Sequence, residues 1–262
     1  MQPEITTHTE ALPARPPLVA GTLYLVATPI GNLEDITLRA LRVLRECDAV
    51  CAEDTRHTGQ LLTHFGIRKS LLSYHKFNEA RRSEEILERL RSGQRLALVT
   101  DAGSPGISDP GQRVVTACLQ AGLRVEPVPG ACALIAALTA SGLSTDAFRF
   151  AGFPPVKSGQ RARFLAEWLR SPETVVLYES PYRIEKLLSE IAALAPERPT
   201  AVARELTKKF EEWLRGTAQE VVAELIRRPR KGEFVVVIGA EPKARAGALL
   251  PEEDANDSVV AS

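Results

Sequence analysis

Five short clusters of polar and small residues each follow an apolar stretch that is typical of a buried β-strand. They are residues 28–33, 53–58, 74–79, 101–105 and 129–131. Their carboxylates could position a hydroxyl group or remove its proton, and their basic side chains could hold phosphates. Ligands bind outside the carboxyl ends of strands in open parallel sheets, so we expect the five clusters to converge on one crevice.

The elements that must position these clusters follow from hydrophobic periodicity. The predicted strands are residues 23–27, 49–52, 71–74, 96–99 and 125–128. Helices are predicted over residues 37–45, from Ser83 to a stop at Gly93, and over 114–119, with a capping box at Ser83. This alternation predicts a parallel sheet with helices on both faces.

The pattern changes after Gly130, where a helix of small residues is predicted over 131–140. Further strands are predicted at 148–152, 174–178, 200–204 and 234–238, and further helices at 159–170, 182–194 and 217–227. We therefore expect two α/β lobes, an N-terminal one over 21–130 and a C-terminal one over 131–240. Residues 1–20 and 241–262 are predicted to be disordered tails, the second of them acidic.

Composition excludes several classes of protein. The 262 residues hold 33 basic and 33 acidic side chains, which argues against a polybasic nucleic-acid binder, although residues 21–240 carry 30 bases against 26 acids. No apolar run approaches the roughly 18 residues of a membrane span. The four cysteines are scattered, which favours buried thiols over disulfides or a metal site. We expect a cytoplasmic protein with no metal and no membrane partner.

The common nucleotide and hydrolase motifs are missing. No two glycines are separated by a single residue, so the G-x-G-x-x-G fingerprint of dinucleotide binding is absent. The sequence also lacks the phosphate-binding loop of nucleoside triphosphatases, the G-x-S-x-G elbow and the H-E-x-x-H zinc motif. These absences weigh against dehydrogenase, ATPase, serine hydrolase and metalloprotease activities.

Six ordered motifs carry a resemblance to a known family. They are residues 28–36, 52–58, 101–111, 178–183, 204–208 and 231–234. With them the chain resembles the ribosomal RNA small subunit methyltransferase I family, a branch of the tetrapyrrole methylases, over residues 20–240. It departs from the family pattern at Ser104, where Thr is expected, and at Ala131, where a second proline is common.

The resemblance implies a fold and a reaction. The expected fold has two α/β lobes, a mostly parallel N-terminal sheet and a mixed C-terminal sheet, with the ligand cleft between them. The implied methyl donor is S-adenosylmethionine, and the implied acceptor is the ribose 2′-hydroxyl of cytidine 1402, in ribosomal numbering, of 16S ribosomal RNA. The implied substrate form is the assembled small subunit, and the enzyme is expected to be a homodimer.

The donor site is expected at the strand ends of both lobes. The candidate residues are Pro29, Asp101, Gly103, Ser104, Pro105, Gly130, Ala133, Glu179 and Ser180. Gly103 would let a ligand approach the backbone, and Ser104 could donate a hydrogen bond. Two structural alternatives stay open: a turn in which Asp101 caps its own backbone, and a Gly130 that serves only close helix packing.

The catalytic candidates are Glu53, Glu205 and Lys208, because a ribose hydroxyl is a weak nucleophile that needs a base or a stabilising charge. The sequence does not rank them, and Glu205 could be no more than the ion-pair partner of Lys208. The candidate RNA contacts are Arg56, His57, His75, Lys76 and Arg183. Residues 74–78, which include Phe77, could form an aromatic and basic contact for RNA or could be only a partly exposed strand end. For residues 53–58 a helix cap with an Asp54–Arg56 pair is an alternative, and the basic stretch 227–231 could be either RNA-facing or solvated.

Two other functions remain open at this stage. The same fold could methylate a carbon of a tetrapyrrole, although that reaction needs a broad apolar pocket. The fold could also serve a noncatalytic RNA-binding assembly factor, which would have no need of S-adenosylmethionine. Binding of the methyl donor separates the second alternative from the enzymes.

Overall fold

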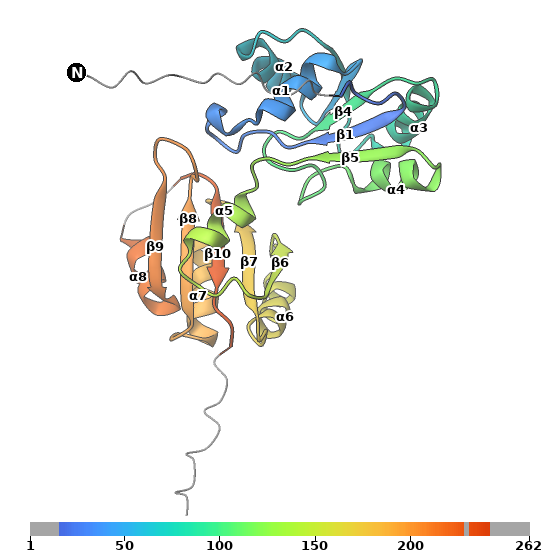
Figure 1. Ribbon diagram of the computed structural model, residues 1–262. Coiled ribbons are helices and arrows are strands. Elements are labelled where there is room, and N and C mark those ends of the chain that lie inside the picture. The colour runs from blue at the N-terminus through green and yellow to red at the C-terminus, as the bar shows by residue number, and fades with distance from the viewer. Residues whose placement is uncertain (1–15, 228–230, 242–262) are drawn as a thin grey trace, which may run out of the picture. The chain divides into compact units, whose positions relative to one another are not determined.

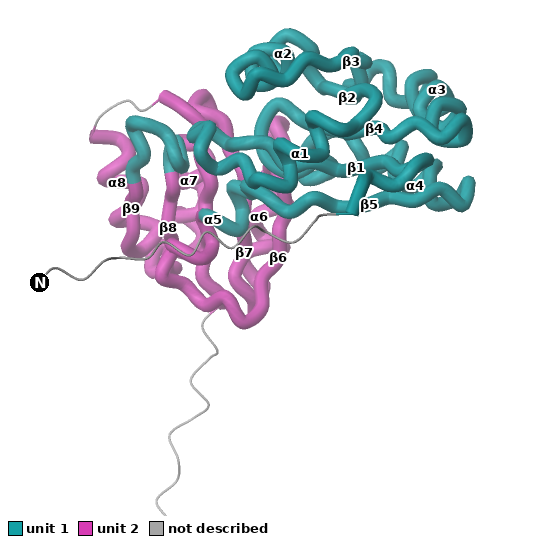
Figure 2. Tube along the Cα trace, turned by 45° about the horizontal axis from the view of Figure 1, so that its top comes forward, with its two compact units in different colours: residues 1–136, 204–212 teal, residues 137–203, 213–262 magenta. Residues whose placement is uncertain are grey.

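The computed structural model describes residues 16–227 and 231–241 (Figure 1). The chain divides into two compact units (Figure 2). Residues 1–136 and 204–212 form the first unit, and residues 137–203 and 213–262 form the second. The short segment 204–212 thus belongs with residues that precede it by more than sixty positions. The predicted division into lobes at residue 130 stays a prediction.

The first unit contains a five-stranded sheet in the order β3-β2-β4-β1-β5. Its strands are β1 (Thr22–Val26), β2 (Ala49–Ala52), β3 (Ser70–Ser73), β4 (Leu96–Val99) and β5 (Arg124–Val128). Every neighbouring pair is parallel. The carboxyl ends of all five strands therefore lie at one edge, as the sequence predicts.

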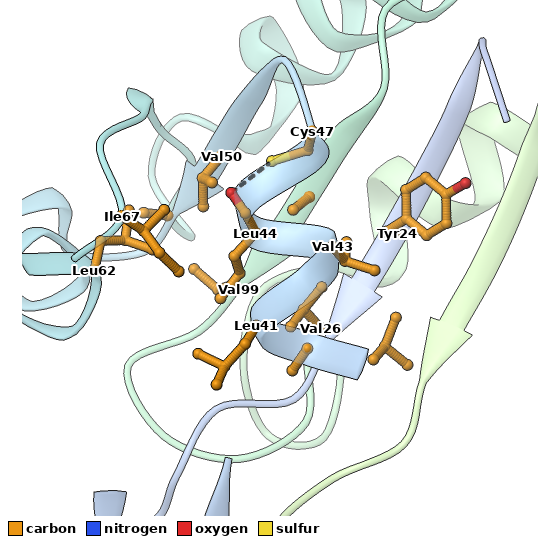
Figure 3. Close-up of a cluster of buried hydrophobic side chains, with 14 of the residues drawn as sticks. Tyr24, Val26, Leu41, Val43, Leu44, Cys47, Val50, Leu62, Ile67 and Val99 are labelled. Atoms are coloured by element: carbon orange, nitrogen blue, oxygen red, sulfur yellow. Dashed lines mark hydrogen bonds between the residues drawn. The ribbon is translucent and has the colours of Figure 1, made fainter. Parts of the chain in front are cut away.

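Helices cover both faces of this sheet (Figure 1). They are α1 (Leu38–Glu46), α2 (Thr55–His64), α3 (Glu79–Arg91) and α4 (Gln112–Gln120), with a short 3-10 helix, η1 (Leu33–Asp35). Apolar residues of α1 and α2 pack on one face, around Leu44, Val50 and Val99 (Figure 3). Those of α3 and α4 pack on the other face. Strands β2 and β4 are buried at every position because both of their faces are covered.

A topological switch lies between β1 and β4. The chain leaves β1 through α1 and crosses β4 to reach β2, whereas it leaves β4 through α4 and crosses β1 to reach β5. The two connections thus run to opposite faces of the sheet. Ligands in open α/β sheets bind at such a switch, so the loops that follow β1 and β4 are the first place to look for one.

The second unit contains a mixed sheet in the order β6-β7-β10-β8-β9. Its strands are β6 (Phe148–Gly152), β7 (Thr174–Glu179), β8 (Pro199–Arg204), β9 (Glu212–Thr217) and β10 (Phe234–Ile238). Strand β6 is parallel to β7, and β7 is antiparallel to β10. Apolar residues of α6 (Ser158–Trp168), α7 (Ile184–Leu194) and α8 (Ala218–Ile226) form the core with this sheet. Helix α5 (Ala133–Ala140) contains the boundary between the two units.

The predicted α/β class, with one parallel and one mixed sheet, is confirmed, and the predicted strands lie within one residue of those observed. Three local predictions are wrong. Helix α3 begins at Glu79, and the Ser83 hydroxyl donates to the Glu79 carbonyl inside the helix instead of capping it. Residues 55–58 form the first turn of α2, and strand β9 was not predicted. The first turn of α2 is polar and β9 has no fully buried residue, so neither shows a clear apolar pattern.

Other expectations concern side chains and the chain ends. Cys47, Cys51 and Cys118 are buried free thiols and Cys132 is a half-buried one, as predicted. Within the described ranges no cluster of potential metal ligands occurs. None of the helices described is long and apolar enough to cross a membrane. The predicted tails fall mostly outside the described residues, as do residues 228–230 of the basic stretch.

Candidate functional site

The loops that follow β1 and β4 are joined directly by their backbones. The amide of Thr28 donates to the carbonyl of Gly103 at 2.9 Å, and the amide of Gly103 donates back at 3.0 Å. The buried Thr28 hydroxyl donates to the Thr100 carbonyl at 3.1 Å. These bonds fix both loops at the topological switch, so the edge of the sheet is rigid where a ligand is expected.

Glycines let a third loop, the one after β5, approach the same place. A side chain on Gly130 would bring its Cβ within 2.9 Å of the Ala27 Cβ, so the close contact requires glycine. Gly103 has φ +82°, a left-handed conformation that favours glycine. The Ser104 hydroxyl donates to the Ala131 carbonyl at 3.2 Å. The three loops therefore present backbone groups and small side chains, which suits close contact with a flat ligand.

Asp101 connects the β4 loop to the β2 loop. Its carboxylate accepts a hydrogen bond from the Asp54 amide at 3.1 Å, so it does not cap its own turn as the structural alternative required. The neighbouring Glu53 is half-buried, and its pKa is raised above the ordinary value, first by burial and then by the negative charge of Asp101. The electrostatic interaction with His75 lowers the pKa of Glu53 in part. A carboxylate with a raised pKa accepts a proton more readily than an ordinary one.

The segment after Glu53 is a helix N-terminus. Asp54 is the N-cap of α2, and its side chain accepts from the Arg56 amide at 2.8 Å. The Arg56 guanidinium lies 3.3 Å from the same carboxylate and is 89% exposed. The cap and ion pair named as the alternative are therefore both present. His57 is exposed on the same turn, and the predicted RNA contacts of Arg56 and His57 stay predictions.

The Lys208 side chain lies against Gly31, in the loop that follows β1 in the first unit. Its Cγ atom is 2.3 Å from the point that a Cβ of Gly31 would occupy, so the lysine stem needs glycine there. The Lys208 ammonium is 2.9 Å from the Glu205 carboxylate. The structure thus brings two of the three catalytic candidates together beside the loop that follows β1. Glu53 belongs to a different group, with Asp101 and His75.

The turn that carries Lys208 has an unusual backbone. Glu205 and Thr207 have φ values of 52° and 66°, in the left-handed region that side chains rarely adopt. The Thr207 amide donates to the Glu211 carboxylate at 2.6 Å, while the Thr207 hydroxyl is buried without a hydrogen-bond partner among the described residues. Such strained residues are concentrated at functional sites, and here they hold Lys208 against Gly31.

The loop between β3 and α3 carries the other basic candidates. The His75 Nδ1 atom accepts from the Phe77 amide at 3.2 Å, and the two rings meet edge to face at 6.1 Å. Asn78 braces the loop by accepting from the His75 amide at 2.8 Å. Lys76 is exposed and lines a cleft of about 750 Å³ together with Glu53. His75 therefore braces its own loop and Lys76 lines the cleft, and the predicted RNA contacts of both stay predictions.

Three predicted residues lie in the second unit and bond to one another. The buried Glu179 carboxylate accepts from the Ser180 amide at 2.7 Å and from the Arg183 guanidinium at 2.6 Å. Arg183 also donates to the Pro154 carbonyl at 3.2 Å. The other carboxylate oxygen of Glu179 is buried with no partner in the part of the chain described. These three residues thus bond to one another and to nearby backbone of the second unit, and their predicted contacts with donor and RNA stay predictions.

Pro29 and Pro105 lie in the loops after β1 and β4, and Ala133 begins α5, and their predicted contacts with the donor stay predictions. Sequence reasoning missed Thr207 and the reason for Gly31. Gly31 lies inside a quoted motif, but only its contact with the distant Lys208 reveals its role. Phe77 belongs to the predicted aromatic and basic RNA contact over residues 74–78 and is 92% exposed, and that contact stays a prediction.

The amino-acid sequence of this chain is similar to those of known methyltransferases. Residues 22–222 match the family described as Tetrapyrrole (Corrin/Porphyrin) Methylases. The chain is 49% identical over 241 residues, 91% of its length and 86% of the relative's, to a Synechocystis protein named ribosomal RNA small subunit methyltransferase I. A protein of the same name from Xylella fastidiosa is 49% identical over 83% of this chain and 81% of its own.

Solved structures agree with the fold. The uroporphyrin-III C-methyl transferase of Thermus thermophilus, complexed with S-adenyl homocysteine, is 25% identical with a TM-score of 0.57, and the match covers 82% of this chain and 96% of that one. The methyltransferase CobJ is 18% identical with a TM-score of 0.62 over 84% of this chain and 93% of that one. The likeness to CobJ concerns the fold alone.

Proposed function

The chain belongs to the ribosomal RNA small subunit methyltransferase I family of the tetrapyrrole methylases, and from this membership we propose that it methylates 16S ribosomal RNA with S-adenosylmethionine as donor. The proposed acceptor is the ribose 2′-hydroxyl of a cytidine, presented by the assembled small subunit. The observation that carries the proposal is the near-half identity, over most of the chain, to relatives of that name. Relatives of other function share much less sequence in the solved structures compared.

The edge of the parallel sheet fits the proposed donor. The mutual hydrogen bonds of Thr28 and Gly103 leave the β1 and β4 loops close together, and Gly130 keeps the β5 loop free of a side chain. Small residues and exposed backbone groups there suit an adenosyl group. When bound, the sulfonium of the donor supplies an activated methyl group. The residues of this chain then have to orient the acceptor and exclude water.

Two groups of this unit can assist the acceptor hydroxyl. The half-buried Glu53, with its raised pKa, is suited to accept the proton. The Lys208 ammonium is suited to stabilise negative charge on the ribose oxygen, and the stem of Lys208 is fixed against Gly31. Glu205, paired with Lys208 at 2.9 Å, is then a positioning residue. We assign the base to Glu53 and the charge stabilisation to Lys208.

A folded particle is the proposed form of the substrate. Ribose hydroxyls and phosphates carry no base code, so recognition of the acceptor depends on shape. Residues 21–240 hold only four more bases than acids, which favours a preformed RNA surface over naked RNA. The same family membership supports a homodimer that acts in the cytoplasm. Sedimentation at several protein concentrations tests the dimer.

The experiment that tests the function is transfer of labelled methyl from S-adenosylmethionine to small subunits that lack the modification. Nuclease digestion then locates the label. Label on one ribose 2′-oxygen of a cytidine in 16S ribosomal RNA is the expected result. Equal methylation of protein-free RNA would contradict the requirement for the particle. Donor binding without any transfer to small subunits would contradict the proposed substrate.

A further inference from the structure

The cleft of about 750 Å³ in the first unit lies outside the residues assigned to donor and catalysis, apart from Glu53 at its end. It is lined by Glu53, Lys76, Glu79, residues 108–113, Thr116, Ala117 and Gln120. We propose that this cleft binds the single-stranded RNA next to the acceptor nucleotide. The inference rests on the proposed function, and it assigns a binding role to residues of α4 and to Phe77.

The position of the cleft relative to the sheet supports this role. Glu53 follows β2 and lies beside Asp101, which follows β4 at the topological switch. From there the cleft continues along one side of α4, because residues 112, 113, 116, 117 and 120 share one face of a helix. That face is roughly 12 Å long at 1.5 Å per residue. A single RNA strand whose acceptor nucleotide reaches Glu53 can therefore continue along α4.

The side chains on the cleft match the groups that RNA presents. Lys76 and Arg113 are exposed cations on its two sides, from the β3–α3 loop and from α4, and can contact phosphates. The amides of Gln112 and Gln120 and the hydroxyl of Thr116 are exposed and can pair with base edges or with 2′-hydroxyls.

Three carboxylates, those of Glu53, Glu79 and Asp109, line the cleft beside the two cations. The Glu79 carboxylate is already engaged in hydrogen bonds. Glu79 accepts from the Tyr74 hydroxyl at 3.2 Å and from the Gly111 amide at 3.2 Å. These bonds tie the β3–α3 loop to the start of α4, so the two sides of the cleft are held together. The cleft is thus a fixed feature of the unit, and binding of RNA does not have to order it first.

Phe77 supplies a surface for base stacking. Its side chain is 92% exposed, next to Lys76 in sequence, and its ring meets His75 edge to face. Asn78 donates to the Ser73 carbonyl at 3.2 Å and accepts from the His75 amide, which fixes the loop that presents the ring. An exposed aromatic beside a cation is the arrangement by which proteins hold single strands without reading their sequence.

The test is binding of a short, fluorescently labelled single-stranded RNA, measured by anisotropy, to the full chain. We compare Arg113→Gln and Phe77→Ala with the matched control Arg91→Gln. Arg91 is the last residue of α3, at the end of that helix away from Phe77. Arg113→Gln and Phe77→Ala are expected to weaken binding about tenfold, and Arg91→Gln less than about twofold. Arg113→Gln should also reduce the salt slope by about 0.7, whereas Phe77→Ala should leave it unchanged.

The outcomes separate this inference from the proposed function. Binding of S-adenosylhomocysteine, followed by calorimetry, is expected to be the same in all variants and reports that they fold. Equal RNA affinity of the three variants, or no RNA binding by the unaltered chain at low salt, overturns the inference. Weaker association of Arg113→Gln with small subunits at unchanged RNA affinity would indicate a protein contact and also overturn it. If the variants weaken RNA binding as expected but the unaltered chain does not methylate small subunits, only the proposed function is overturned.

Discussion

Two segments of this molecule have similar sequences and different structures. An acid, a serine and a proline follow β4 as Asp101, Ser104 and Pro105, and the same three types occur at the end of β7 and just after it, as residues 179–181. After β4 the side chains bond to other loops, Asp101 to the Asp54 amide and Ser104 to the Ala131 carbonyl. After β7 the acid bonds within its own segment. Polar residues after a strand can therefore either connect several loops or bond within their own segment, and residue type alone does not distinguish the two cases.

The difference has a local cause. Gly103 turns the β4 loop through a left-handed conformation toward Thr28, and this turn carries Ser104 across to the β5 loop. The segment after β7 has no glycine, and α7 begins at Ile184 after an N-cap Arg183. Arg183 then folds back on Glu179 within one helical turn. The first segment is bonded to neighbouring loops, and the second is bonded mainly to itself.

The largest expected effect concerns the segment after β7. Glu179→Ala removes a buried carboxylate and leaves the mostly buried Arg183 guanidinium without its charged partner, so we expect a loss of about 3 kcal/mol in the free energy of unfolding. Urea denaturation measures it. Glu224→Ala, which breaks the exposed pair with Arg227, is the control and should cost less than about 1 kcal/mol. Loss of donor binding at unchanged stability would instead make Glu179 part of the donor site.

The second prediction concerns catalysis in the first unit. Lys208→Met keeps the stem over Gly31 and removes the charge, so kcat should fall about a hundredfold while donor affinity stays unchanged. Lys209→Met, at the exposed neighbouring position, is the matched control and should leave kcat unaltered. Methyl transfer to small subunits provides the measurement. A change in the KM for the particle with normal kcat would make Lys208 an RNA contact only.

The third prediction tests the segment after β4. Gly103→Ala has room for its Cβ, 3.5 Å from Ile30, but must hold φ near +82°, which costs roughly 1–2 kcal/mol. We expect the β4 loop to shift and S-adenosylhomocysteine affinity to fall about tenfold, measured by calorimetry. Gly93→Ala is matched in conformation, at φ +88° with open space, and lies far from the carboxyl edge. It should cost similar stability and leave donor affinity intact, and equal losses of affinity in both would refute the role of Gly103.

The smallest effect is a pH dependence at Glu53. Its pKa is raised in the folded state, so the folded protein is favoured while the carboxyl is protonated, and this advantage is lost as the pH rises through the raised pKa. Glu53→Gln should therefore be slightly more stable than the unaltered chain at neutral pH. The difference should vanish below the ordinary value of 4.5. Thermal unfolding across this range measures it, and a gain that persists at low pH would point to a cause other than ionisation.

Sequence reasoning predicted the parallel sheet well because β2 and β4 are apolar at every position and are bounded by turn residues. It missed α2, whose first turn is polar and looks like the loops around it. It also placed the start of α3 at Ser83, four residues late, because Ser83 satisfies its hydroxyl inside the helix instead of at its end. Short elements without a fully buried apolar face, such as β9, give a weak periodic signal.

The polar edge of the parallel sheet could be predicted because it depends on short segments. Glycines and prolines after strands predict turns, and the order of the strands brings these turns to one edge. The partnership of Lys208 with Gly31 could not be predicted, because the two residues are far apart in the chain and join only when residues 204–212 pack on the first unit. The same holds for the cleft, which combines Glu53, Lys76 and one face of α4.

The sequence by itself determined the α/β class, the parallel sheet, the positions of its polar edge and the resemblance to a methyltransferase family. These depend on residue periodicity and on motifs read within a few positions. Only the tertiary structure decided which polar residues connect neighbouring loops and which bond within their own segment. Asp101 and Glu179 are alike in sequence, and what separates them is whether their hydrogen-bond partners come from another loop or from their own. Partner choice depends on distances between segments, and a linear pattern does not contain them.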